Sequence, residues 1–292
     1  MMNRFRPFAC FAVCLLWAAA SFAAEPPSAP ANAAGQPSAN KQSSFMPAGL
    51  GGGGPIEVTA QQSLEWHQNE RMYLAKGQAK AARGDVTISA EELAAYERVD
   101  ASGKHEIYRL AARDNVRIQS KEHVIEGDEG TYDADKRLAV LTGKNLRFTD
   151  SKAVVTASDA MEYWQDKLQA VARGHAVAIR DDRRVAADML IAQFRTLPNG
   201  TMELQQLTAE GHVVITTKGD VVRGDRGVYD MNRNSAVLSG NVKVTRGQSQ
   251  MEGAVAEVDM NTGLSRMTAA GKDNRIRALF LPGSEAGAPQ LP

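Results

Sequence analysis

The side chains that most often carry chemistry are spread thinly along this chain. Neighbouring carboxylates occur at Glu91-Glu92 and Asp181-Asp182, where turns or a solvated surface explain them without general acid–base chemistry. A zinc site needs ligands at short, regular spacing, and the five histidines do not have it. They are His67, His105, His123, His175 and His212. No nucleophile elbow is visible. We therefore expect no catalytic residue, no metal ligands and no cofactor.

Two glycine motifs could bind an ion or a phosphate. The run 51–54 is followed by Pro55 and Ile56 instead of Gly-Lys-Ser/Thr, so it is not a phosphate-binding loop. The pattern Gly-Asp-x-Gly-x-Tyr-Asp occurs at 127–133 and at 224–230. Calcium-binding β-rolls repeat such residues every nine positions, and this chain does not. In the structural interpretation, glycine permits close backbone approach and tyrosine packs against a sheet.

The first 23 residues have the composition of a secretory signal peptide. Arg4 and Arg6 form a basic start, an apolar stretch runs from Phe8 to Ala20, and small residues precede a cleavage point after Ala23. A retained membrane anchor is the alternative, but the apolar stretch is short for a membrane span. Both cysteines lie within this segment, so the exported chain would contain no disulfide.

Charge and composition argue against several classes of protein. Without Arg4 and Arg6, 32 of the 34 basic residues remain beside 34 acidic ones, a net charge of −2. A nucleic-acid-binding protein would have a basic excess, so we expect no nucleic-acid partner. Hydrophobic residues make up 43% of the chain, which is enough for a core. Aromatic residues make up only 6%, which disfavours a carbohydrate-active cleft.

Composition divides the remaining chain into three parts. Residues 24–55 are rich in Ala, Pro, Ser, Gln and Gly, which predicts a flexible linker. Residues 56–281 alternate apolar and polar side chains, which predicts β-strands. Residues 282–292 are rich in Gly and Pro, and we expect them to form a disordered tail.

The β-rich region is a tandem duplication. A glycine-type step, with Asp at one place, introduces a strand at positions 77, 114, 143, 174, 211, 240 and 271. The spacings are 37, 29 and 31 residues, and then the same three again, which gives a period of 97 residues. The two copies meet near residue 157. As an example, Leu110, Ala112, Val116 and Ile118 correspond to Leu207, Ala209, Val213 and Ile215.

Each third of a copy predicts two strands joined by a short turn. In 207–230, Val213 and Ile215 occupy alternate positions, Lys218-Gly219 marks a turn, and a second extended run follows. The segment 90–99 could form a helix, but it aligns with strand segments of other units, so we predict a strand. The predicted fold is all-β, with about 14–16 antiparallel strands stacked along one axis.

The same alternation predicts which side chains face inward. Val116 and Ile118 flank Arg117, so these two point into the core. After Gly143 the alternation of apolar and polar residues shifts by one position, which a β-bulge would explain. In any β-fold these residues would pack as core, and contact with a ligand is the alternative. The predicted inward residues are Val116, Ile118, Leu146, Phe148, Val213, Ile215, Val242 and Val244.

The repeated pattern A-x-G-x-V-x-I, G-D-x-G-x-Y-D and A-V-L-x-G-x-V over 56–281 resembles the LptA/OstA family of periplasmic lipopolysaccharide-transport proteins. The resemblance implies an elongated, twisted, open antiparallel β-jellyroll whose apolar groove, lined by the inward residues above, holds the acyl chains of lipopolysaccharide. It also implies that the end strands pair with related folds. These are an LptC-like inner-membrane protein, the N-terminal domain of an LptD-like outer-membrane protein, or a second copy of this chain joined head to tail. The end-strand residues would be Ile56, Val58, Ile276 and Ala278.

Two hypotheses about function follow. The first is a non-enzymatic bridge in the periplasm that carries lipopolysaccharide from the inner to the outer membrane. We expect an LptA-like member, because neither the membrane-spanning segment of an LptC-like protein nor the large barrel of an LptD-like protein is visible. The alternative is a structural or adhesive β-repeat protein of the cell envelope, which would have a closed, dry core.

Overall fold

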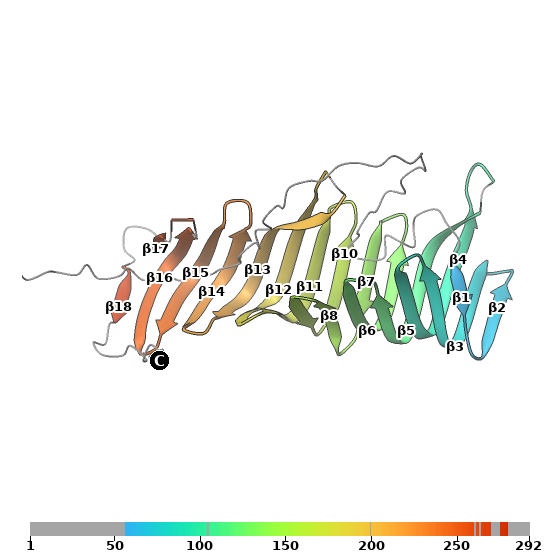
Figure 1. Cartoon of the computed structure of the whole chain (residues 1–292), viewed down its shortest axis with the longest axis horizontal. Coiled ribbons are helices and arrows are strands. Elements are labelled where there is room, and N and C mark those ends of the chain that lie inside the picture. Colours follow the sequence, from blue (N-terminus) through green and yellow to red (C-terminus); the bar gives the residue numbers. More distant parts are fainter. Residues whose placement is uncertain are drawn as a thin grey trace, which may run out of the picture.

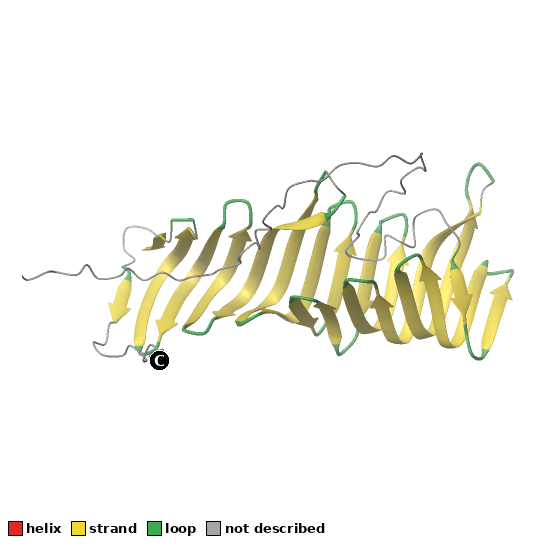
Figure 2. Ribbon diagram, in the orientation of Figure 1, coloured by secondary structure: helices red, strands yellow, loops and turns green. Residues whose placement is uncertain are grey.

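The computed structural model describes residues 56–103, 105–198, 200–259, 261–262, 264–269 and 275–279. Its strands form one antiparallel sheet of 18 strands, which follow one another along a single long axis (Figure 1). The described ranges contain strands, turns and loops but no helix (Figure 2). No helix there is long and apolar enough to cross a membrane. The predicted all-β, antiparallel, elongated fold is confirmed.

The strands fall into two series that correspond to the two copies. The first copy contains β1 (Glu57–Thr59), β2 (Ser63–His67), β3 (Met72–Arg83), β4 (Val86–Val99), β5 (His105–Gln119), β6 (His123–Asp133), β7 (Leu138–Thr142) and β8 (Leu146–Asp150). The second contains β9 (Ala153–Ala157), β10 (Ala160–Trp164), β11 (Gln169–Arg180), β12 (Arg183–Thr196), β13 (Met202–Thr216), β14 (Asp220–Asp230) and β15 (Ser235–Arg246). Three further strands follow: β16 (Ser249–Asp259), β17 (Leu264–Thr268) and β18 (Arg277–Leu279).

The long strands change register near their middle, and these shifts fold the sheet in two. In β3 the shift lies between Lys76 and Ala79. On one side of it β3 pairs with β2, and on the other side it pairs with β1. We call the line of shifts the corner. Wall A is the part of the sheet that contains β2, β7, β10 and β17, and wall B is the part that contains β1, β8, β9 and β18.

The anchor residues of the repeat lie at this corner. Gly77, Asp114, Gly174, Gly211 and Gly240 have positive φ angles between 60° and 81°. A β-carbon is strained in this region of conformational space, which explains the preference for glycine. The residue after each anchor also has a positive φ. Two left-handed residues in succession therefore turn the strand from wall A into wall B.

The Gly-Asp step occupies the corner on the intervening strands. A β-carbon on Gly224 would lie 2.8 Å from a side-chain atom of the next strand, so glycine is required there. The Asp225 carboxylate accepts a hydrogen bond from Nδ2 of Asn241 at 2.8 Å. In the first copy, the Asp128 carboxylate accepts one from the backbone N–H of Lys144 at 2.9 Å. The motif joins neighbouring corners, which supports its structural interpretation.

Four strands are divided in two at the corner, which explains why the count exceeds the predicted 14–16. A bend over 143–145 separates β7 from β8, and Gly143 has a φ of 141°. The extra residue predicted there exists, but it breaks the strand instead of forming a bulge within it. The pairs β1 and β2, β9 and β10, and β17 and β18 are likewise halves of strands. Joining the four pairs would reduce the 18 strands to 14.

The two copies join without interrupting the sheet, because β7 pairs with β10 and β8 pairs with β9. The hairpin predicted at 207–230 is formed by β13 and β14, and the segment 90–99 lies within β4 as predicted. The expected signal peptide, linker and tail lie outside the described residues. At the C-terminal end, Arg277–Leu279 forms β18, which contains the predicted end-strand residue Ala278.

Candidate functional site

Inward side chains form continuous rows along the sheet, because each is paired in register with the inward residue of the next strand. Wall A carries two such rows. The row nearer the corner is Leu64, Ala75, Leu93, Ala112, Gly130, Leu141, Met161, Ala172, Leu190, Ala209, Gly227, Leu238, Ala256 and Met267. The outer row is Trp66, Tyr73, Ala95, Leu110, Tyr132, Ala139, Tyr163, Ala170, Ala192, Leu207, Tyr229, Ala236, Val258 and Ser265.

Wall B carries a facing row. It consists of Val58, Ala81, Ile88, Ile118, Ile125, Phe148, Val155, Ala178, Val185, Ile215, Val222, Val244, Met251 and Ala278. Charged residues make up 23% of the sequence, yet none lies in any of the three rows. The two walls therefore form a trough with an apolar inner surface.

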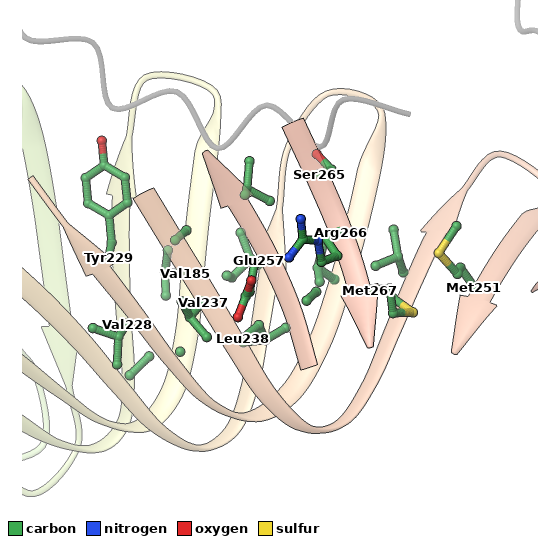
Figure 3. Close-up of a pocket in the computed structure, with 18 of the residues that line it drawn as sticks. Val185, Val228, Tyr229, Val237, Leu238, Met251, Glu257, Ser265, Arg266 and Met267 are labelled. Carbon is green, nitrogen blue, oxygen red and sulfur yellow. The ribbon is translucent and has the colours of Figure 1, made fainter. Parts of the chain in front are cut away.

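Both walls line the same cavities. Among the described residues, an apolar cavity with a volume of about 460 Å³ lies in the first copy, between side chains such as Leu93 of wall A and Ile118 of wall B. Two smaller cavities of about 100 Å³ each lie near the middle of the molecule and in the second copy. Figure 3 shows the second-copy cavity, where the strands curve and Tyr229 and Met251 lie on opposite walls. Of these three cavities, the one nearest the N-terminal end of the sheet is the largest.

All eight predicted inward residues are buried in the core, where they form two groups. The group at the corner is almost fully buried and consists of Val116, Leu146, Val213 and Val242. The group on wall B lines cavities and consists of Ile118, Phe148, Ile215 and Val244. The corner group supports the fold, and the wall B group forms part of the trough surface.

The sequence prediction missed wall A. Leu110 and Ala112 were used to align the two copies, but the prediction did not say whether their side chains point to the inner or the outer face of the sheet. The reason lies in the corner, which shifts the inward phase on half of the strands. In β4, for example, Ile88 faces inward on wall B, but Leu93 and Ala95 face inward on wall A, so even positions give way to odd ones. A strict alternation counted along β4 from Ile88 would place Leu93 on the wrong face.

Tyrosines mark the outer edge of wall A. The Tyr132 hydroxyl donates a hydrogen bond to Oε1 of Gln165 at 3.2 Å, and the Tyr229 hydroxyl donates one to Oδ1 of Asn234 at 2.9 Å. Burial raises the pKa of Tyr163, in the same row, to about 12. Tyrosine combines an apolar ring with a polar tip. The row therefore separates the apolar trough from its wet rim.

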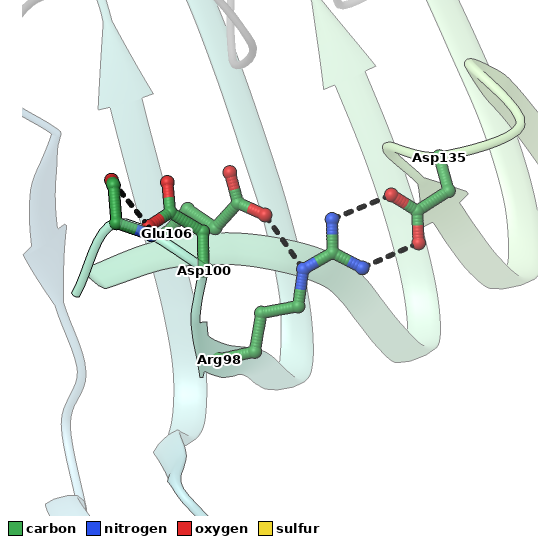
Figure 4. Close-up of polar contacts among 5 residues, drawn as sticks. Arg98, Asp100, Glu106 and Asp135 are labelled. Atoms are coloured by element: carbon green, nitrogen blue, oxygen red, sulfur yellow. Dashed lines mark hydrogen bonds and ion pairs between the residues drawn. The ribbon is translucent and has the colours of Figure 1, made fainter. Parts of the chain in front are cut away.

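Ion pairs hold the longest hairpin of the first copy to its neighbour. Arg98 of β4 donates hydrogen bonds to Glu106 of β5 and, through two nitrogens, to Asp135 in the β6–β7 turn, each at 2.6 Å (Figure 4). The guanidinium group holds the pKa of Asp135 below its usual value. Asp100 accepts hydrogen bonds from Ser102 within the β4–β5 turn. This end of the hairpin is therefore fixed against the β6–β7 turn.

The strands at both ends of the sheet leave apolar side chains exposed. Ile56 and Val58 at one end and Ile276 at the other are exposed, as is Ala278 of β18. The predicted end-strand residues did not include any residue of β2 or β17, although these two strands are longer than β1 and β18. Among the described strands, each of these four pairs on one side only, with β3 or with β16. The edges therefore present both unpaired backbone groups and apolar surface.

Two of the histidines are paired with carboxylates of a neighbouring strand. His212 at the corner is hydrogen-bonded to the Asp188 carboxylate at 2.8 Å, which raises the pKa of His212. His105 bonds to Glu97, and this bond lowers the pKa of the Glu97 carboxyl. Within the described ranges, no group of three or more His, Cys, Asp or Glu side chains could hold a metal ion. These pairs join neighbouring strands.

The fold and the trough define a class of protein: a β-jellyroll with an elongated apolar interior that can keep hydrocarbon chains away from water. The sequence matches the family described as LptA/(LptD N-terminal domain) LPS transport protein twice, over residues 57–159 and 156–264. This chain therefore belongs to that family of lipopolysaccharide-transport proteins. The two matches meet beside residue 157, where the 97-residue period predicted the junction.

Among solved structures, the chain is similar to LptH from Pseudomonas aeruginosa, described as the LptA-homologous periplasmic component of the lipopolysaccharide transport device. The two sequences are 17% identical, and the TM-score is 0.39. The similarity covers 44% of this chain and 95% of LptH. No curated protein sequence matches this chain.

Proposed function

We propose that this protein carries lipopolysaccharide across the periplasm, from the inner to the outer membrane, with the acyl chains in the trough and the sugars in water. The observation that carries the proposal is the set of three apolar rows, which run along both walls without a charged side chain. Family membership supplies the identity of the lipid.

The energetics favour this arrangement. Each methylene removed from water contributes about 0.8 kcal/mol, so a lipid with several acyl chains needs a continuous apolar path. A charged residue within a row would interrupt that path, because burying an unpaired charge costs several kcal/mol. The rows pass from β2 to β17 through the junction between the copies. Transfer along them requires no covalent step, so the function is non-enzymatic.

A structural or adhesive role is the second candidate, and it predicts a closed, dry core. The cavity of about 460 Å³ in the first copy favours transport instead, because a purely structural β-repeat would pack this space with side chains.

Photo-crosslinking tests the proposal directly. A photoreactive residue at Ile118 or Ile215 lies inside the trough, whereas Arg117 and Arg223 are exposed and adjacent to inward positions. We expect adducts with lipopolysaccharide from the two inward positions and none from the two outward positions. Equal labelling at all four positions, or none at the inward ones, would refute lipid binding in the trough.

We also propose that the end strands join this protein to its partners by strand addition. An LptC-like inner-membrane protein, the N-terminal domain of an LptD-like outer-membrane protein and a second copy of this chain all suit an edge with unpaired backbone groups. In this arrangement the trough would continue from one protein to the next. Residues 1–23 would export the chain to the periplasm.

Proline at the C-terminal edge tests this docking. Arg277→Pro in β18 removes one backbone donor from a strand that, among the described strands, pairs on one side only. We expect co-purification with an LptD-like N-terminal domain to fall sharply while the melting temperature changes little. A parallel fall in both would mean that β18 serves folding and not docking.

A further inference from the structure

Two hairpins extend wall A beyond its outer row. Their ladders shift register a second time, at Glu97 in β4–β5 and at Phe194 in β12–β13. We call the paired residues beyond these shifts arm 1 (97–99 and 105–107) and arm 2 (194–196 and 202–204). The backbone N–H groups of Glu97 and Phe194 donate hydrogen bonds to a carbonyl of the turn that precedes the neighbouring strand, at 2.9 and 2.8 Å. A register shift of this kind bends a strand, so the arms depart from the line of wall A.

Each arm turns one face toward the trough. In arm 1, Ile107 lines the cavity of about 460 Å³, and Arg98 lies on the opposite face. In arm 2, Met202 packs against the core, and Arg195 lies on the opposite face. The inner face of each arm therefore continues the inner face of wall A.

Arm 2 leans over the inner face of wall A. The Tyr163 hydroxyl of β10 donates a hydrogen bond to the sulfur atom of Met202 at 3.5 Å. Met202 belongs to β13, which lies three strands from β10 in the sheet, a separation of about 14 Å. To reach Tyr163, arm 2 must cross β12 and β11, and in Figure 1 the joined ends of β12 and β13 run sideways toward β10. Tyr163 at the end of this contact is 2% exposed.

Arm 1 has a different inner face. Glu97 and His105 occupy the positions that Phe194 and Met202 occupy in the second copy, and they are hydrogen-bonded to each other. Tyr73 of the adjacent strand remains 47% exposed. An apolar inner face that covers a tyrosine is therefore found on arm 2, whereas the equivalent residues of arm 1 form a polar pair.

The outer faces of the arms differ as well. Arg98 of arm 1 is joined to Asp135 in the β6–β7 turn, beyond its own hairpin. The residue equivalent to Asp135 in the second copy is Asn232, and Arg195 pairs with Glu203 inside arm 2 itself. An ion pair to another turn thus fixes arm 1, whereas the contact of Met202 holds arm 2.

The trough is narrow where arm 2 lies. The cavity lined by Ala170 and Ala192, at the base of arm 2, has a volume of about 100 Å³, compared with about 460 Å³ in the first copy. A lipid in the first-copy cavity must displace arm 2 to reach the second copy. The contact that resists this movement is weak, because a thioether is a poor hydrogen-bond acceptor and the methionine side chain is flexible.

We propose that arm 2 is a gate on the lipid path. Closed on Tyr163, it separates the first-copy part of the trough from the second-copy part, and it lifts when a lipid passes between them. The inference rests on the proposed function, and it adds a point of control to it. The contact between Met202 and Tyr163 sets how often the gate opens.

Thiol labelling measures the opening without any lipid. The chain from residue 24 onward contains no cysteine, so Ala170→Cys places a single thiol beneath arm 2. We expect a water-soluble maleimide to label this thiol slowly. Met202→Ala, or Met202→His, which installs the residue of arm 1, should speed the labelling by about 3-fold or more, the effect of losing one methionine–aromatic contact. Glu203→Gln is the matched control on the outer face of arm 2, and it should change the rate by less than about 2-fold.

A cross-link tests whether lipid must pass the gate. Tyr163→Cys and Met202→Cys, joined by a short reducible bis-thiosulfonate, hold arm 2 closed. A photoreactive residue at Ile118 or Ile215 then reports lipopolysaccharide in the first or the second copy. We expect adducts from both positions in the protein without the cross-link, loss of one of the two when the cross-link is present, and its return on reduction.

The two experiments separate the gate from the proposed function. Adducts from both positions in the cross-linked protein would overturn the gate but leave lipid transport intact. Labelling of Ala170→Cys at a rate that Met202→Ala does not change would do the same. Adducts from neither position, with or without the cross-link, would instead overturn the proposed function.

Discussion

The strands β2 and β10 are equivalent in the repeat but differ in their surroundings, and the difference shows what the sheet lacks at its end. Leu64 of β2 is 63% exposed, whereas its counterpart Met161 of β10 is 6% exposed. Trp66 is 42% exposed, whereas its counterpart Tyr163 is 2% exposed. β10 pairs with β7 and β11, whereas among the described strands β2 pairs with β3 alone. Within the described part of the chain, the same apolar pattern is therefore covered on both sides in the middle of the molecule and on one side at the end.

The cavities differ between the two copies. The lining residues of the two copies are of similar types, as at Leu93 and Leu190 or at Ile118 and Ile215. The first-copy cavity is nevertheless several times larger, although both this cavity and the second-copy cavity reach an end strand, at Leu64 of β2 and at Met267 of β17. Side-chain type at equivalent positions therefore does not by itself set the open space in the trough. Substitutions at equivalent positions can test this comparison.

The largest effect on stability should come from the corner. Gly211 has a φ of 76°, and a β-carbon there would lie 2.1 Å from Oδ2 of Asp188. We expect Gly211→Val to lower the free energy of unfolding by about 2–3 kcal/mol, since a β-branched residue is strained in this conformation. Gly211→Asp installs the residue of the first copy, Asp114, and should cost about 1 kcal/mol. Denaturant unfolding measures both values. Equal losses would mean that steric contact, and not backbone conformation, sets the requirement.

A cavity-filling pair comes next. Ala95 and Ala192 are equivalent, but Ala95 lines the cavity of about 460 Å³ and Ala192 lines one of about 100 Å³. We expect Ala192→Trp to destabilise the protein by about 1–3 kcal/mol through overpacking. Ala95→Trp should leave stability nearly unchanged while reducing lipid binding. Thermal unfolding and a lipid-binding assay separate the two effects. If Ala95→Trp proved as destabilising as Ala192→Trp, the first-copy cavity would not be an open space in solution.

A smaller difference is expected between the two rim tyrosines. The Tyr229 hydroxyl bonds within its own β14–β15 turn, whereas the equivalent Tyr132 hydroxyl bonds to Gln165 in the turn between β10 and β11, at a longer distance. Tyr229→Phe should cost about 1 kcal/mol, the usual value for one buried hydrogen bond. Tyr132→Phe should cost less. Comparison of the two variants by urea unfolding checks the order, and a larger loss for Tyr132→Phe would reverse the assignment.

The smallest effect concerns pH. Asp188 raises the pKa of His212. In the first copy the position of His212 is occupied by Asn115, which does not titrate. Because the folded-state pKa is raised, the pair stabilises the fold fully below the unfolded-state pKa of histidine, and this contribution disappears as the pH rises through the folded-state value. In Asp188→Asn, nuclear magnetic resonance titration should show a lower pKa for His212, and the loss of melting temperature should be confined to acidic pH. An unchanged His212 pKa would contradict the pairing.

Sequence alone determined the architecture. The 97-residue period, the turns and the anchor glycines follow from the chemistry of single positions, because only certain residues adopt a positive φ and alternation reveals a strand. The eight inward residues followed from the same alternation, as did the two-copy organisation.

Tertiary structure decided the rest, because the deciding contacts join strands that are distant in sequence. The corner shifts the phase of β4 by one residue, so the inward face of wall A at Leu93 depends on pairing with β3 and β5. Exposure of Leu64 depends on whether a strand lies beside it. Local pattern therefore specified the strands and the repeat, and only their assembly specified the corner, the trough and its rim.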